Sequence, residues 1–313
     1  MSVIEIPGKG GLRRLLLTHP AGSSAEIYLH GAHVTSWIPA GGAEWLFISG
    51  AARFGEFQTI RGGIPVIFPQ FAERGSLPKH GFARQQTWRR IDGTDAMARA
   101  DDGERRADDE PGADDVTDKT ARADGEAHCR AILELTDSAA TRSRWPHRFR
   151  ARVTVELGSD VLAVTLDVHN TDDRPFDFTA ALHSYFRVED IGRVAVAGLQ
   201  GCVYLDKPAD MQQRAQAEDR ISVAGETDRV YPDAPAEVRL MDDVAGRELI
   251  VAKDGFHDIV VWNPWQEITS DLPDMTPGDY RHMLCIEAAQ AVTPIELEPG
   301  EGWRGSQTLI QSR

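Results

Sequence analysis

Two side chains of the kind that transfer protons stand in apolar segments of this chain. His183 lies within ALHSYF, and Glu287 is the only charged residue of LCIEAA. Histidine titrates near neutral pH, and burial raises the pKa of a carboxyl group, so the two could serve as proton donor and acceptor. A lone histidine among apolar residues is also a common core residue. The sequence alone leaves both interpretations open and does not show whether the two side chains face each other.

A stretch rich in proline and glycine, residues 61–84 (RGGIPVIFPQFAERGSLPKHGFAR), carries further polar groups. Its prolines disfavour a regular central strand, and its apolar residues are too many for a solvated linker. We therefore expect an ordered loop anchored on the core. Arg61 and Arg84, near its two ends, suit a phosphate or carboxylate, which a guanidinium binds through two parallel hydrogen bonds. Surface ion pairing is the alternative interpretation for both arginines.

Other polar candidates are scattered singly. Gln70 and His80 belong to the same loop, and Asp228 lies within GETDRVYPD. Gln70 and Asp228 are of types that bind sugar hydroxyls, although either could instead cap a turn. The sequence contains no phosphate-binding glycine loop, no dinucleotide fingerprint and no nucleophilic-serine elbow. Because His30 and His33 have no third ligand nearby, we predict no metal site.

The elements that must position these side chains are short strands. Apolar segments rich in β-branched and aromatic residues recur with a period of two, separated by turn residues. Many such strands without an interleaved helical period favour one large antiparallel β-sandwich over an α/β fold. The one helix-like stretch is residues 210–220. Strands are predicted at residues 13–18, 25–30, 33–38, 85–91, 129–135, 148–157, 161–170, 178–188, 192–206, 221–225, 236–242, 248–253, 258–264 and 283–290.

The charge balance limits the partners. The chain has 313 residues and a net charge of -15, which argues against a nucleic acid or an anionic membrane as the main partner. Residues 92–128 are acidic and poor in large apolar side chains, so we expect a disordered insertion within one domain, residues 1–313. Three widely spaced cysteines fit reduced thiols, and we see neither a signal peptide nor a long apolar run. We expect a cytoplasmic protein.

Seven motifs, taken in order, are more specific than any single residue. They are RGGIPVIFPQF, LPKHGFAR, ALHSYFRV, GLQGCVYLDK, ETDRVY, VVWNPW and CIEAA. Together they resemble the hexose-6-phosphate mutarotases (glucose-6-phosphate 1-epimerases), a branch of the aldose 1-epimerase superfamily, and the match covers almost the whole chain except the acidic insertion. The resemblance implies a galactose-mutarotase-like β-sandwich that needs no metal or redox cofactor. It assigns His183 as general acid, Glu287 as general base, His80 to the sugar ring, Arg61 and Arg84 to the 6-phosphate, and Gln70 and Asp228 to the sugar hydroxyls.

The resemblance also implies an activity. The chain would be a monomeric isomerase that interconverts the α and β anomers of a hexose 6-phosphate, glucose 6-phosphate being the expected substrate. Two alternatives remain: an aldose 1-epimerase acting on unphosphorylated sugar, and a non-catalytic carbohydrate-binding or sensor protein on the same fold. The two arginines favour a phosphorylated substrate. The isolated Glu287 favours catalysis, because sugar binding alone needs no desolvated base.

Overall fold

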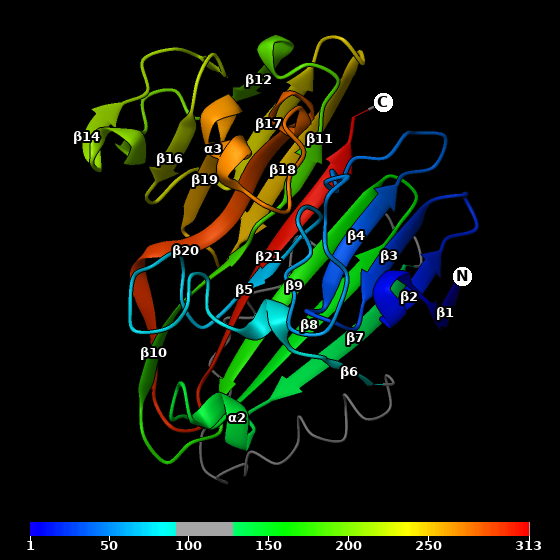
Figure 1. The fold of residues 1–313 in the computed structure, drawn as a ribbon, viewed down its shortest axis with the longest axis vertical. Helices are drawn as coiled ribbons and strands as arrows, with labels where there is room; N and C mark the ends of the chain where they lie inside the picture. The colour runs from blue at the N-terminus through cyan, green and yellow to red at the C-terminus, as the bar shows by residue number, and fades with distance from the viewer. Residues whose placement is uncertain (92–127, 313) are drawn as a thin grey trace, which may run out of the picture.

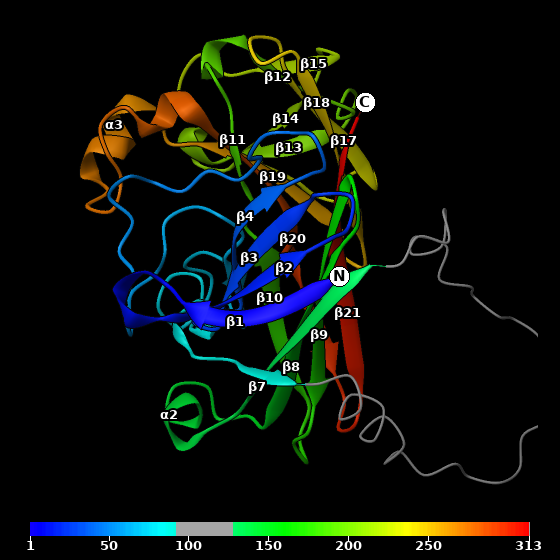
Figure 2. The ribbon, with the colours of Figure 1, turned by 90° about the vertical axis from the view of Figure 1, so that its right-hand side faces the viewer.

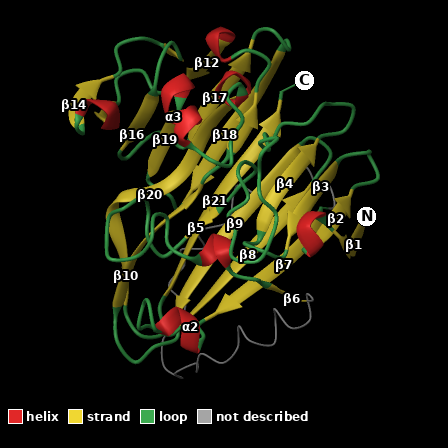
Figure 3. Ribbon diagram, viewed as in Figure 1, coloured by secondary structure: helices red, strands yellow, loops and turns green. Residues whose placement is uncertain are grey.

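Antiparallel β-sheets supply most of the regular secondary structure of the described residues (Figure 1). The computed structural model describes residues 1–91 and 128–312, and strands dominate them, with few helices (Figure 3). They form sheets of four, eight and nine strands, in the orders β1-β2-β3-β4, β14-β13-β16-β19-β20-β10-β5 with β11 also beside β20, and β15-β12-β17-β18-β21-β9-β8-β7-β6. The predicted all-β sandwich is confirmed. The disordered insertion predicted at residues 92–128 falls, except for His128, outside the described residues.

The strands have the following bounds. The four-stranded sheet contains β1 (Ser2–Pro7), β2 (Arg13–Thr18), β3 (Ser24–Tyr28) and β4 (His33–Ile38). The eight-stranded sheet contains β5 (Val66–Ile67), β10 (Phe176–Leu182), β11 (Tyr185–Arg187), β13 (Val203–Asp206), β14 (Gln212–Ala215), β16 (Thr227–Tyr231), β19 (Asp258–Asn263) and β20 (Met283–Leu297). The nine-stranded sheet contains β6 (Arg89–Ile91), β7 (Cys129–Thr136), β8 (Phe149–Leu157), β9 (Val161–Asn170), β12 (Val194–Ala197), β15 (Arg220–Ser222), β17 (Glu237–Asp242), β18 (Arg247–Asp254) and β21 (Gly302–Gln311).

One hydrophobic core draws on the inner faces of all three sheets. Trp37 of β4, Ile286 of β20 and Leu309 of β21 are each fully buried in it. The period of two supplies these faces, as in β8, where Ala151 and Val153 point inward on alternate positions. Strands β1 and β2 contact β7, and Figure 2 shows the N-terminal sheet, in blue, beside β7 and β8. The core therefore packs the eight-stranded sheet, which carries His183, Glu287 and Asp228, against the other two sheets.

The loop of residues 61–84 is anchored as its composition predicts. Its short strand β5 pairs with β10, with Val66 opposite Leu182 and Ile67 opposite Ala181. Phe68 is fully buried and contacts the rings of Phe82, Phe149 and Phe178, among others. Aromatic contacts of this kind fix a loop that lacks a regular ladder. The loop thereby gains a fixed position beside β10.

The helix predicted at residues 210–220 is wrong. The segment forms strands β14 and β15 instead, and β14 pairs with β13 as an edge hairpin. The hairpin loop spans residues 207–211, between Asp206 and its partner Gln212, and ends on Asp210 and Met211, which have left-handed φ angles of 52° and 61°. Sheet pairing has thus overridden local helix propensity.

Two short α-helices were not predicted. They are α2 (Ala139–Arg142) and α3 (Trp265–Asp271), and no helix in the described part of the chain is long and apolar enough to cross a membrane. A capping box between Ser138 and Thr141 starts α2. The remaining helical turns are 3-10 in type: η1 (Lys9–Gly11), η2 (Ala83–Gln85), η3 (Ile191–Arg193), η4 (Lys207–Ala209) and η5 (Asp279–His282). The strand predicted at residues 85–91 is shorter than expected: Gln85 belongs to η2, and β6 begins at Arg89.

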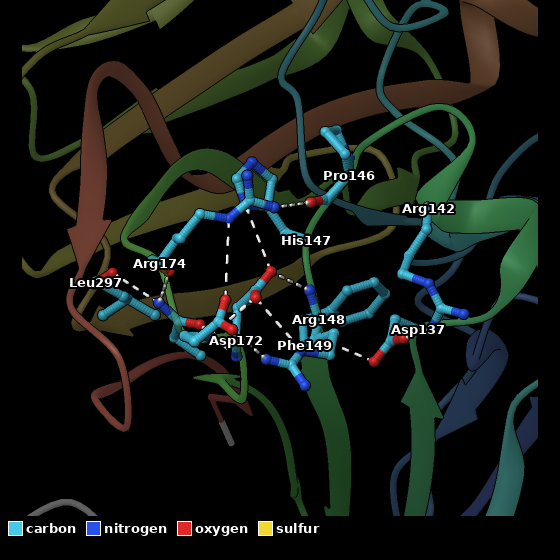
Figure 4. A network of polar contacts seen from close by, with 11 residues as sticks. Asp137, Arg142, Pro146, His147, Arg148, Phe149, Asp172, Arg174 and Leu297 are labelled. Atoms are coloured by element: carbon cyan, nitrogen blue, oxygen red, sulfur yellow. Dashed lines mark hydrogen bonds and ion pairs between the residues drawn. The ribbon is translucent and has the colours of Figure 1, made fainter.

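A polar network closes the end of the fold near α2 (Figure 4). Asp172, in the turn after β9, accepts hydrogen bonds from the main-chain N–H groups of Arg148 (2.8 Å) and Asp173 (2.8 Å). The Arg148 Nε–H also donates to it, at 3.3 Å. Asn170 donates from its amide to the carbonyls of Arg174 and Leu297. These bonds join β8, β9 and the end of β20.

Candidate active site

A gap between two strands brings the two proton-transfer candidates together. Strand β10 ends at Leu182 and β11 begins at Tyr185, and both pair with β20 in one unbroken register, Leu182 opposite Ala288 and Tyr185 opposite Cys285. This register places His183 directly opposite Glu287. The imidazole Nε2 of His183 lies 3.4 Å from Oε1 of Glu287. Directly opposite residues of an antiparallel pair share one face, which explains why two residues so distant in sequence meet.

Both members of this pair are desolvated. Glu287 is 2% exposed and His183 7%. Within the described residues, Nδ1 of His183 and Oε2 of Glu287 are buried and lack a hydrogen-bond partner. Burial raises the pKa of Glu287 well above its ordinary 4.5, and the charge of Asp228 adds to that shift. Burial also lowers the pKa of His183 well below 6.5, assisted by the charges of Arg84 and Arg61.

Two aromatic side chains hold the imidazole. The ring of Tyr185 stacks on that of His183, with centroids 4.8 Å apart and planes 10° apart. Trp262 of β19 meets both rings edge-on, at 5.8 Å from His183 and 5.9 Å from Tyr185. Sequence reasoning missed both residues. The period of two contains a signal for Tyr185, because residues two apart on a strand share a face.

The two arginines of the 61–84 loop have different surroundings. Arg61 donates from Nη1 to the Tyr185 hydroxyl (3.0 Å) and from Nη2 to Asp274 (3.0 Å). Burial lowers the pKa of Arg61, but Tyr185 and Asp274 raise it more, and the net shift is upward. Arg84 donates from Nη2 to the carbonyl of Lys79 (2.8 Å). Among the described residues Arg84 forms no ion pair with a carboxylate, and burial lowers its pKa to about 10.

His80 faces the catalytic candidates from the same loop. Its ring lies 5.5 Å from that of His183, centroid to centroid, at 72°. Its Nδ1 accepts a hydrogen bond from the main-chain N–H of Ala72 (3.2 Å), so the proton of the neutral ring is on Nε2. Burial, followed by the charges of His183 and Arg84, lowers the pKa of His80. His80 also has a left-handed φ of 67°, a conformation that costs free energy and often marks a functional position.

Asp228 and Gln70, both predicted to bind sugar hydroxyls, have different hydrogen-bond partners. Asp228 of β16 pairs with Lys207, whose Nζ lies 2.8 Å from Oδ2, and its charge acts on Glu287. Gln70 uses its amide within the loop, donating to the carbonyls of Ala72 and Leu77 and accepting from the N–H of Leu77. Its side chain therefore shapes the loop that carries His80. The hydrogen bonds of Gln70 thus lie within the loop and not at the pair. The other predicted site residues act on the pair through a ring contact (His80) or through their charges (Arg61, Arg84 and Asp228).

Two charged partners escaped sequence reasoning. Asp274 lies in an irregular segment after α3 with no motif to mark it, and Lys207 falls at the end of GLQGCVYLDK. The described residues contain no group of three or more His, Cys, Asp or Glu side chains arranged to hold a metal ion.

A hollow of about 390 Å³ lies elsewhere, on the outer face of the nine-stranded sheet. Its lining includes Arg152 and Arg304, which pair with Glu134 (3.0 Å) and Asp167 (2.6 Å). Cross-strand ion pairs on a solvated sheet face are ordinary surface structure. The desolvated pair on the eight-stranded sheet is the stronger candidate for chemistry.

The chain is similar to known proteins over most of its length. The family model for aldose 1-epimerase matches residues 13–110 and 116–309, so the chain belongs to the aldose 1-epimerase family. The "putative glucose-6-phosphate 1-epimerase" of Cenchrus ciliaris is 37% identical over 96% of this chain and 84% of its own length. The protein of the same name from Escherichia coli strain K12 is 32% identical over 88% of this chain and 83% of its own length. A crystal structure titled "a putative mutarotase (YeaD)" from Salmonella typhimurium has a TM-score of 0.82 and 28% identity, covering 99% of this chain and 94% of that one.

Proposed function

We propose that this chain interconverts the α and β anomers of a hexose 6-phosphate, with glucose 6-phosphate as the first substrate to test. The main support is the desolvated His183–Glu287 pair, whose side chains lie 3.4 Å apart, together with the two arginines whose charges act on His183. Membership of an epimerase family and the names of two relatives support the same reaction.

The reaction needs one proton acceptor and one proton donor. Glu287 takes the proton of the C1 hydroxyl while His183 gives a proton to the ring oxygen, and the C1–O5 bond breaks to leave the open-chain aldehyde. Rotation about C1–C2 presents the other carbonyl face. Reversal of the two transfers then closes the ring to the other anomer and restores both side chains. The pair must hold one proton in total, on His183 when the ring opens. The raised pKa of Glu287 and the lowered pKa of His183 place that proton on the carboxyl in the free site, so substrate binding must move it to the imidazole.

The phosphate group contributes to this proton balance. After burial, the charges of Arg84 and Arg61 are the largest causes that lower the pKa of His183. A phosphate bound by these guanidiniums offsets their positive potential and raises the proton affinity of the imidazole. The substrate thus favours the protonated His183 that opens its own ring. An unphosphorylated sugar lacks this effect.

The remaining site residues bind rather than transfer protons. The Nε2–H of His80 is the donor available to stabilise charge on the ring oxygen. Asp228 and Lys207 offer an acceptor and a donor to sugar hydroxyls. Gln70 contributes through the loop, by keeping His80 and Arg84 in place.

The test is exchange between the anomers measured by NMR saturation transfer at C1, with glucose 6-phosphate and glucose as parallel substrates. The expected result is a kcat/KM at least about 10²-fold higher for the phosphorylated sugar, since charge-assisted hydrogen bonds are stronger than neutral ones. A higher kcat/KM for glucose contradicts the phosphate assignment. Tight binding of either sugar without exchange contradicts catalysis and indicates a binding protein.

A further inference from the structure

Gln307, a buried glutamine of the nine-stranded sheet, forms hydrogen bonds next to both residues of the catalytic pair. Gln307 of β21 is 1% exposed and lies between the sheets, on the same inner face as Leu309. A primary amide in such a core is costly unless its donor and acceptor are both satisfied. The bonds that Gln307 makes therefore explain its presence there.

Each end of this amide bonds beside one member of the pair. Nε2 of Gln307 donates to the carbonyl of Ile286 at 3.0 Å, and Oε1 accepts a short hydrogen bond from the hydroxyl of Ser184. Ser184 follows His183, and Ile286 precedes Glu287. One side chain from the nine-stranded sheet therefore bridges the two positions next to the proton-transfer groups.

The bridge lies where the strand ladder is incomplete. The N–H of Ile286 donates to the carbonyl of Ser184 (3.2 Å), as an antiparallel pair requires. The reciprocal bond is missing, because the N–H of Ser184 donates to the carbonyl of Leu182 (3.0 Å). The Gln307 amide takes the place of that missing donor at the Ile286 carbonyl.

The gap also fixes the backbone of His183 itself. The N–H of His183 donates to the carbonyl of Pro65 (3.1 Å), which ties it to the 61–84 loop. The segment between β10 and β11 is thus bound to two other parts of the chain: the 61–84 loop through the His183 N–H, and Gln307 through the Ser184 hydroxyl. Both bonds keep it from completing the ladder with β20. If the ladder closed here, the orientation of His183 toward Glu287 would change.

We propose that Gln307 is a positioning residue for proton transfer, which keeps the ladder open at Ser184 and fixes His183 against Glu287. The proposal rests on the anomer exchange proposed above. It predicts a change in kcat more than in KM, because Gln307 lies on the far side of the sheet from the substrate. A misplacement of about 1 Å at a catalytic group typically lowers the rate by about 10²-fold.

The experiment compares Gln307→Met with a matched control, Gln290→Met. Gln290 is also a buried glutamine, and its amide bonds the carbonyl of Thr293 and the N–H of His257. Methionine keeps the length of the side chain and removes both hydrogen bonds. We expect Gln307→Met to lower kcat by about 10- to 10²-fold with KM within about threefold, and Gln290→Met to leave kcat within about twofold.

Further readouts separate positioning from a general loss of packing. The pH dependence of kcat should shift in Gln307→Met but not in Gln290→Met, because only the former changes the environment shared by His183 and Glu287. Ser184→Ala should lower kcat by about 3- to 10-fold and should add little in the Gln307→Met background, because the hydrogen bond between Ser184 and Gln307 is already lost there. Additive effects of the two changes contradict the bridge.

Each outcome decides the proposal. Unchanged kcat in a folded Gln307→Met variant overturns it, and if that variant does not fold, unchanged kcat in Ser184→Ala does so. If the unmodified protein exchanges no anomers, the proposed function fails on its own. In that case a crystal structure of Gln307→Met, or of Ser184→Ala if it does not fold, tests positioning directly, and an unchanged separation between His183 and Glu287 overturns the inference.

Discussion

Two buried carboxylates of this protein lie near the same kinds of side chain and have opposite electrostatic properties. Glu287 lies beside His183, on which the charges of two arginines act, and Asp172 lies beside His147 (3.8 Å) and Arg148 (3.3 Å). The pKa of Glu287 is raised well above its ordinary range. The pKa of Asp172 is lowered well below its own, first by the hydrogen bond from the Arg148 N–H.

The difference is the number of hydrogen bonds to the charged form. Asp172 accepts hydrogen bonds from two main-chain N–H groups and a guanidinium. Figure 4 shows Arg148 beside it. Glu287 has a single contact with His183 at 3.4 Å, and its Oε2 is buried without a partner among the described residues. Bonds to a carboxylate stabilise its charge, whereas burial alone destabilises it.

This contrast separates a stabilising network from the proposed proton-transfer pair. A satisfied carboxylate such as Asp172 remains ionised and ties segments together. An unsatisfied one such as Glu287 costs folding free energy but gains proton affinity, which a general base near neutral pH requires. Residue type alone therefore does not separate the two sites, whereas hydrogen-bond satisfaction does.

The largest expected effect is the loss of exchange in Glu287→Gln. The amide cannot take the proton of the C1 hydroxyl, and we expect kcat to fall by about 10²- to 10⁴-fold. The melting temperature should be equal or higher, because a neutral side chain replaces a poorly solvated acid. Saturation-transfer NMR and a thermal melt measure the two quantities on the same sample. Near-normal exchange, or exchange lost together with a large drop in melting temperature, contradicts the contrast.

Arg84→Met tests the anion side of the reactive centre. Arg84 is a better choice than Arg61. Replacing Arg61 would leave the carboxylate of Asp274 without its ion-pair partner, whereas Arg84 forms no ion pair with a carboxylate among the described residues. We expect kcat/KM for glucose 6-phosphate to fall by about 10- to 10²-fold, the range for a charge-assisted hydrogen bond. Exchange of glucose should not fall, because loss of the Arg84 charge removes one cause that lowers the pKa of His183, and it serves as the control. Equal losses for both sugars contradict a phosphate contact.

Asp172→Asn tests the stabilising network. The amide keeps one acceptor oxygen and loses the charge, so we expect the free energy of unfolding to fall by about 1–3 kcal/mol. Urea denaturation measures this value, and kcat per folded molecule should stay within about twofold. A loss of exchange without a loss of stability would assign a function to Asp172 and remove the contrast.

Much of the fold could be predicted from the sequence because period-two patterns report local burial. Most predicted strands are present, including Phe149–Leu157 and Val161–Asn170. The error at residues 210–220 arose where an edge hairpin, paired only on one side, carries polar side chains that also suit a helix. Pairing across sheets is a tertiary property that a local pattern does not contain.

The site was predictable in its residue types and not in its geometry. His183 and Glu287 are conspicuous as a histidine and a lone carboxylate in apolar segments, but their contact depends on the register of β10 and β11 against β20. Asp274 and Gln307 had no such signal, because one lies in an irregular segment and the other bonds across the core. Gln70 had the right composition and a different use, since its amide is engaged within its own loop.

The smallest effect is the pH dependence of stability, and its sign differs between the two carboxylates. Because the folded pKa of Glu287 is raised, its contribution is present below the ordinary value of 4.5 and is lost as pH rises through the folded pKa. The stability of Glu287→Gln relative to the unmodified protein should therefore increase with pH above about 4.5. The folded pKa of Asp172 is lowered, so its contribution is present above 3.8 and is lost as pH falls further.

Denaturation of both variants across this pH range gives two difference curves, from which contributions common to all three proteins cancel. The deficit of Asp172→Asn should shrink below about pH 3.8, while the advantage of Glu287→Gln should vanish toward low pH and grow toward neutral pH. The two curves thus change in different pH windows and have opposite signs at neutral pH. Curves of the same sign at neutral pH would mean that hydrogen-bond satisfaction does not distinguish these carboxylates, and that Glu287 is as well compensated as Asp172.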